Sequence, residues 1–108
     1  MSGFLKQWIP RHFGHFQEPP SSAFSKTYAK VNQDLVNNSQ IDTNLAGSTL
    51  VMVHILKDQL YCANVGDSRA VMGRYVDSQW FAIELSKDQK PSVESEAIRI
   101  MRNGGRIA

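Results

Sequence analysis

Several features that mark whole functional classes are missing from this sequence. Its one cysteine, Cys62, excludes an internal disulfide and a cysteine-based zinc finger. No run approaches the roughly 18 apolar residues that a membrane-spanning helix needs. The 12 Lys and Arg residues are scattered among 10 Asp and Glu residues, so the net charge is only +2 and no basic stripe for nucleic acid is present. The composition therefore predicts neither a membrane nor a nucleic-acid partner.

The first residues also carry no secretory signal. Residues 1–10 contain Lys6 but no apolar core segment and no small-residue cleavage site. The sequence therefore predicts an intracellular protein, cytoplasmic or nuclear. Hydrophobic residues make up 42% of the chain and charged residues 20%, which is typical of one folded domain or part of one.

Apolar residues recur at helical spacing in the first third of the chain. Residues 4–9 predict a short helix that Pro10 ends or bends. After two further prolines, Ser21 or Ser22 is expected to cap a second helix. The predicted apolar face of that second helix consists of Phe24, Tyr28, Val31 and Leu35.

Beyond Gly47 the apolar period changes to two, which predicts four strands. Their expected positions are residues 49–56, 60–65, 69–75 and 80–85. Short turns separate them, so we expect an antiparallel meander. A last helix is expected to open at Pro91-Ser92 and to stop at Gly104-Gly105. This order of two helices, four strands and a helix predicts an α+β fold.

The predicted helices cannot cover both faces of such a sheet. One helical layer shields one face, whereas both faces of the predicted strands carry apolar residues. We therefore expect polypeptide outside these 108 residues to pack against Leu50, Met52, Leu56, Val71 and Phe81.

Asp67 is the strongest single candidate for chemistry. It stands between Gly66 and Ser68 at the end of a predicted strand, where a carboxylate can hold a hard divalent cation such as Mg²⁺ or Mn²⁺. The alternative is an Asx turn, in which the side chain bonds its own backbone, and spacing alone favours that alternative. For the neighbouring Arg69, a local ion pair is favoured over an anion site.

An ordered set of motifs is more specific than any single residue. They are AGST at residues 46–49, ANVGDSRAV at 63–71, LSKDQKP at 85–91 and GGRI at 104–107. In this order and spacing, the segments resemble the metal-dependent protein serine/threonine phosphatases, the PPM or type-2C family. The resemblance is close over residues 47–107 and weaker over residues 4–42.

The resemblance implies a fold, a reaction and a metal requirement. Family members are sandwiches of two antiparallel sheets flanked by helices, so residues 1–108 are expected to be part of such a domain, truncated at both ends. They use two Mn²⁺ or Mg²⁺ ions, and a metal-bound hydroxide attacks the phosphorus of phosphoserine or phosphothreonine. The implied partners are a phosphoprotein substrate and the remainder of the phosphatase domain.

Few site residues carry over from the family. Asp67 corresponds to a ligand of an additional, weaker metal ion, and no catalytic residue is assigned. Gln89 stands where His is common in the family, at a position expected to be peripheral to the cleft. The residues expected to shape the strand ends near the cleft are Gly47, Ser48, Thr49, Gly66, Ser68 and Arg69.

The family's other metal-binding segments do not occur in these 108 residues. An Asp-Gly-His-Gly loop is expected before Phe4, and Asp-Gly and Gly-Asp-Asn segments are expected after Ala108. One carboxylate cannot hold two hard cations, so the chain alone is expected to be inactive. The favoured hypothesis is an internal part of a phosphatase domain. Two alternatives stay open: a non-catalytic interaction module on a degenerate phosphatase scaffold, and an unrelated α+β binding domain, which explains none of the motifs.

Overall fold

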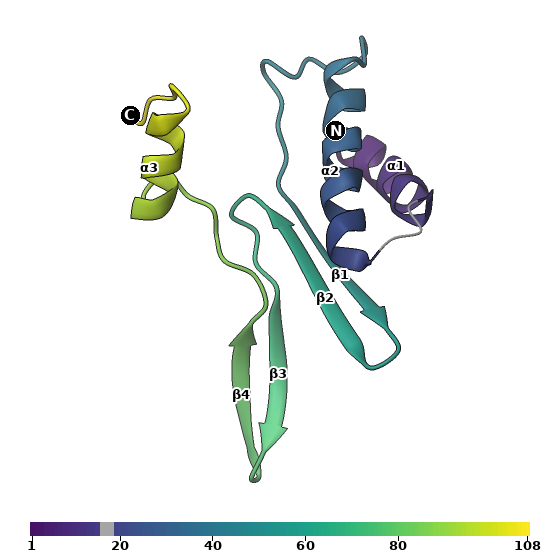
Figure 1. Cartoon of the computed structure of the whole chain (residues 1–108), viewed down its shortest axis with the longest axis vertical. Helices are drawn as coiled ribbons and strands as arrows, with labels where there is room; N and C mark the ends of the chain where they lie inside the picture. The colour runs from purple at the N-terminus through teal and green to yellow at the C-terminus, as the bar shows by residue number, and fades with distance from the viewer. Residues whose placement is uncertain (16–18) are drawn as a thin grey trace. The chain divides into compact units, whose positions relative to one another are not determined.

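The computed structural model describes residues 1–15 and 19–108. In chain order, its elements are α1 (Ser2–His15), α2 (Pro20–Val36), β1 (Leu50–Leu56), β2 (Gln59–Val65), β3 (Val71–Val76), β4 (Gln79–Glu84) and α3 (Glu94–Arg102) (Figure 1). This order confirms the α+β class and the four strands predicted between the helical segments. None of the described helices is long and apolar enough to cross a membrane.

The four strands form two hairpins, each a two-stranded sheet, with β1 beside β2 and β3 beside β4 (Figure 1). The expectation of a single four-stranded meander is therefore wrong for the described residues, because β2 and β3 do not pair. The reason lies in the segment between them, residues 66–70. Its backbone bonds the segment that follows β4, as in the 2.9 Å bond from the Leu85 N–H to the Ala70 carbonyl. It therefore does not close a tight β2–β3 turn.

The β3–β4 hairpin has a well-defined register. Val76 pairs with Gln79, which leaves Asp77 and Ser78 as a two-residue turn. Both turn residues have positive φ, 50° and 63°, as a type I′ turn requires. This turn fixes the antiparallel register over the whole of β3 and β4.

The buried apolar core lies in the helical part of the chain, where α1 packs on α2. The buried face of α2 includes Phe24, Val31 and Leu35, as the sequence predicts, while Tyr28 is half-buried. The Tyr28 hydroxyl donates a 3.1 Å hydrogen bond to the Ala63 carbonyl of β2. Burial raises the pKa of Tyr28 to about 12, because the phenolate would lose its hydration.

Three predicted helix boundaries were wrong. Pro10 does not end the first helix, since α1 continues through it to His15. Removal of one N–H is tolerated there because Ile9 is buried and the Phe13 ring stacks on Phe24 of α2 at 4.9 Å.

The other two boundaries concern helix starts. Neither predicted serine caps α2, because Pro19 is the N-cap residue and Pro20 opens the helix, where a missing N–H costs nothing. The last helix, α3, begins at Glu94, later than Pro91-Ser92, with Val93 as its N-cap residue.

Apolar side chains of the strands are left open, as the sequence analysis expected. The exposed fraction is 46% for Leu56, 54% for Val71 and 50% for Phe81. Leu50 and Met52 of β1 are half-buried.

Candidate functional site

Gly66 begins the turn that follows β2 and leads into Asp67. Its φ of +104° is open to glycine and unfavourable for other residues. A Cβ at this position would lie 2.5 Å from Cγ2 of Thr49, so the backbone approaches the start of β1 more closely than any side chain allows. Two features therefore require glycine at this position, where the sequence predicts a tight backbone: the positive φ and the lack of space for a Cβ atom.

The turn of residues 66–70 is bonded to residues 85–90, the segment after β4. Main-chain bonds run from the Gln89 N–H to the Gly66 carbonyl at 3.0 Å and from the Leu85 N–H to the Ala70 carbonyl at 2.9 Å. The Ala70 N–H donates to the buried Ser86 hydroxyl, also at 2.9 Å. Both ends of the turn are thus fixed to one neighbouring segment, which we call the brace (residues 85–90).

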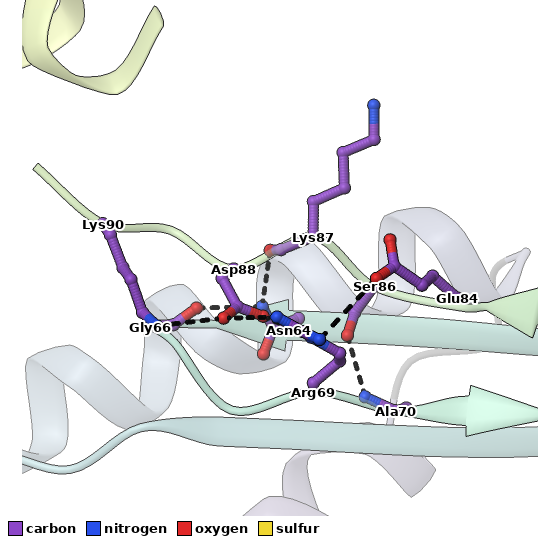
Figure 2. Close-up of polar contacts among 9 residues, drawn as sticks. All are labelled: Asn64, Gly66, Arg69, Ala70, Glu84, Ser86, Lys87, Asp88 and Lys90. Atoms are coloured by element: carbon purple, nitrogen blue, oxygen red, sulfur yellow. Dashed lines mark hydrogen bonds and ion pairs between the residues drawn. The ribbon is translucent and has the colours of Figure 1, made fainter. Parts of the chain in front are cut away.

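Arg69 and Asp88 connect the turn to the brace through a bidentate ion pair (Figure 2). The guanidinium Nε and Nη2 donate to the two Asp88 carboxylate oxygens at 2.9 and 3.0 Å. Lys90 also contacts this carboxylate at 3.2 Å, and Glu84 lies 3.7 Å from Arg69. Figure 2 shows the Lys87 side chain directed away from these contacts. Arg69 therefore forms an ion pair, as expected, but its partners lie on and beside the brace and not at the neighbouring Asp67.

The pKa of Asp88 falls to about 2, because Arg69 and then Lys90 hydrogen-bond its ionised form. A carboxyl group with a depressed folded-state pKa stabilises the fold fully above the unfolded pKa, about 4, and loses that contribution as the pH falls towards about 2. We therefore expect the melting temperature to fall between pH 4 and pH 2, and to fall less in an Asp88→Asn protein. Circular dichroism melts of both proteins across this range measure the difference. Asp77→Asn, at the exposed β3–β4 turn, is the control, and equal slopes for wild type and Asp88→Asn would contradict the prediction.

Asn64 and Gln89 complete the connection, and the sequence analysis assigned neither of them to the site. Asn64 Nδ2 donates to the carbonyls of Gly66 and Lys87 at 3.0 and 3.1 Å. The Gln89 side chain accepts from the Gly66 N–H at 2.9 Å and donates to the Asn64 carbonyl at 3.2 Å. The one available signal was the polar Asn64 near the end of a strand that is largely apolar from Leu60 onward.

Asp67 is exposed, and its carboxylate has no hydrogen-bond or ion-pair partner within the described part of the chain. Asx-type bonds occur elsewhere, from the Gln40 N–H to Asn38 and from the Asn44 N–H to Asp42. The Asp67 side chain therefore does not form the Asx turn that spacing alone favours. Its carboxylate is available to a ligand.

The other residues predicted near the site lie at the start of β1 and along the turn. Thr49 and Ser68 share a 2.6 Å hydrogen bond between their hydroxyl groups. Gly47 and Ser48 are exposed in the loop before β1. Nothing in these contacts involves a reacting group, so their role in shaping a cleft stays a prediction.

The donor groups match a hard cation in kind but not in number. The Asp67 carboxylate is an oxygen ligand of the type that Mg²⁺ and Mn²⁺ prefer. The Asn64 amide oxygen is buried and accepts no hydrogen bond from the described residues. Over residues 1–15 and 19–108, however, no cluster of three or more His, Cys, Asp or Glu side chains could hold a metal ion. These residues therefore offer one candidate ligand and not a complete site.

Comparison with known proteins found a family match over nearly the whole chain. The model of the family described as protein phosphatase 2C matches residues 10–108. Similar proteins include "Probable protein phosphatase 2C 35" of Arabidopsis thaliana, 37% identical over 90 residues, which are 83% of this chain and 26% of the relative. "Probable protein phosphatase 2C 64" of Oryza sativa subsp. japonica is 41% identical over 87 residues, which are 79% of this chain and 20% of the relative.

The similarity extends beyond plants. "Protein phosphatase 2C homolog 3" of Schizosaccharomyces pombe is 37% identical over 84 residues, 78% of this chain and 19% of the relative. The chain thus spans about a fifth to a quarter of the length of the curated relatives that it matches. The comparison with solved structures found no match.

Proposed function

Because this chain belongs to the protein phosphatase 2C family, we propose that the protein carrying it removes phosphate from phosphoserine and phosphothreonine in phosphoprotein substrates. The observation that carries the proposal is the family match over residues 10–108. Relatives in plants and in a yeast are named as phosphatases of this kind, which supports the same reaction class here. The intracellular location remains a prediction from the sequence.

The proposal includes a requirement for Mg²⁺ or Mn²⁺. When bound, such ions acidify a water molecule and neutralise phosphoryl oxygens. Of the residues described here, Asp67 is the proposed ligand, since its carboxylate is exposed and has no partner in the described residues, within a turn held at both ends. We propose that the further ligands come from the remainder of a phosphatase domain of which residues 1–108 are a part. The 108 residues by themselves are then inactive.

Phosphate release from a phosphothreonine peptide by the intact protein tests this function. We expect release with Mn²⁺ and none after the metal is removed with a chelator. Asp67→Asn should raise the Mn²⁺ concentration for half-maximal activity about 10-fold or more. Even the loss of a residue that only orients a metal ligand commonly weakens metal binding by that factor. Asp77→Asn is the matched control, an exposed Asp→Asn change in a turn that accepts Asn.

Two results would contradict the proposal in different ways. Activity that survives complete metal removal would exclude the metal requirement. Failure of the intact protein to release phosphate from any phosphoserine or phosphothreonine peptide, with or without metal, would favour the non-catalytic interaction module.

A further inference from the structure

Gln89 hydrogen-bonds the residues just before Asp67 through its backbone N–H and through both polar atoms of its side-chain amide. The backbone N–H of Gln89 donates to the Gly66 carbonyl at 3.0 Å, and the Gly66 N–H donates back to Oε1 of Gln89 at 2.9 Å. The side-chain Nε2 donates to the Asn64 carbonyl at 3.2 Å. One residue of the brace therefore satisfies both polar backbone groups of Gly66, the residue immediately before Asp67.

The other end of the turn is held independently. Arg69 pairs with Asp88, and the backbone of Ala70 bonds Ser86 and Leu85. Only residues 67 and 68 lie between the two fixed ends, and the Ser68 hydroxyl is bonded to Thr49. Of the two side chains in this short span, that of Asp67 is the one whose polar atoms have no partner in the described residues.

We propose that Gln89 is a positioning residue, which fixes Gly66 and so sets the direction in which the Asp67 carboxylate leaves the end of β2. The inference deepens the proposed function, because it rests on Asp67 being a metal ligand. A turn that is already ordered loses less conformational entropy when it binds a ligand than a mobile one does. Gln89 therefore raises metal affinity without touching the metal, and it is not peripheral to the site.

The amide of Gln89 suits this task because it supplies one acceptor and one donor at the same time. Methionine has a side chain of similar length but neither the amide oxygen nor the amide N–H. The Gln89→Met variant therefore loses the bonds to the Gly66 N–H and the Asn64 carbonyl together. The main-chain bond from residue 89 to the Gly66 carbonyl can remain. Gln79→Met is the matched control, because Gln79 is an exposed residue of β4 in the neighbouring hairpin.

Hydrogen exchange in the intact, metal-free protein tests the contact itself. The Gly66 N–H has the Gln89 side chain as its acceptor, so we expect its exchange to become about 10-fold faster in Gln89→Met and to stay unchanged in Gln79→Met. Unchanged exchange of the Gly66 N–H in Gln89→Met would overturn the inference at this first step.

Mn²⁺ affinity, measured by calorimetry at a temperature where every variant is fully folded, tests the positioning role. We expect about 10-fold weaker binding in Gln89→Met, as for changes to groups that orient a metal ligand. A residue that acts through Asp67 has no effect once Asp67 is gone, so Gln89→Met should not weaken binding further in an Asp67→Asn protein. A merely structural role would weaken binding equally in both backgrounds.

The outcomes separate this inference from the function on which it rests. Weaker binding in Asp67→Asn together with unchanged binding in Gln89→Met would overturn the positioning role and leave Asp67 as a ligand. Unchanged binding in Asp67→Asn would overturn both. Weaker binding from Gln89→Met in the Asp67→Asn background would also overturn the positioning role.

Discussion

Replacement of Gly66 by alanine should destabilise the protein by about 2–5 kcal/mol. A non-glycine residue with a left-handed backbone costs about 1–2 kcal/mol, and Gly66 has a φ of +104°. The new methyl group would also lie 2.5 Å from Cγ2 and 2.9 Å from Cβ of Thr49, an overlap of the kind that costs about 1–3 kcal/mol. Urea unfolding followed by tryptophan fluorescence measures the change in the free energy of unfolding.

Two further variants separate the causes of this loss. Gly104 also has a positive φ, +78°, but nothing lies within 4 Å of its would-be Cβ, so Gly104→Ala should cost only the backbone part of this loss, about 1–2 kcal/mol. Thr49→Ser removes the crowding Cγ2 and keeps the hydroxyl that bonds Ser68, so it should recover part of the loss in the double variant. Equal losses for Gly66→Ala and Gly104→Ala would show that the close approach to Thr49 does not exist.

Periodicity alone was enough to predict the helices and strands and their order in the chain, but not that the strands form two separate hairpins. The apolar face of α2 and the alternation in the strands are local patterns, and the chain order of the elements follows from them. The helix boundaries were less predictable because tertiary contacts override local signals. Pro10 remains inside α1 because Ile9 on the same helix is buried and Phe13 packs on Phe24 of α2.

The candidate site was predictable only at its motif. Asp67 could be singled out because the ordered motifs surround it, but its neighbours could not be assigned. Arg69 pairs with Asp88, 19 residues away, although Asp67 lies two positions from it in the sequence. The contact of Gln89 with Gly66 could not be predicted for the same physical reason. A side chain that bonds backbone atoms of a segment 23 residues away leaves no local pattern in the sequence.

In the helical part of the chain, Phe24→Ala should cost about 3–5 kcal/mol of unfolding free energy in the 108-residue chain. Phe24 is 5% exposed, and its ring lies 4.9 Å from Phe13 of α1 and 6.4 Å from His54 of β1. Its removal leaves a cavity where three elements meet, and neighbouring rings cannot collapse into it without breaking their own contacts. Phe81→Ala is the matched control, since Phe81 is 50% exposed and the same deletion there should cost only about 1 kcal/mol. Comparable losses for the two variants in urea unfolding would mean that the Phe24 cluster does not carry the core.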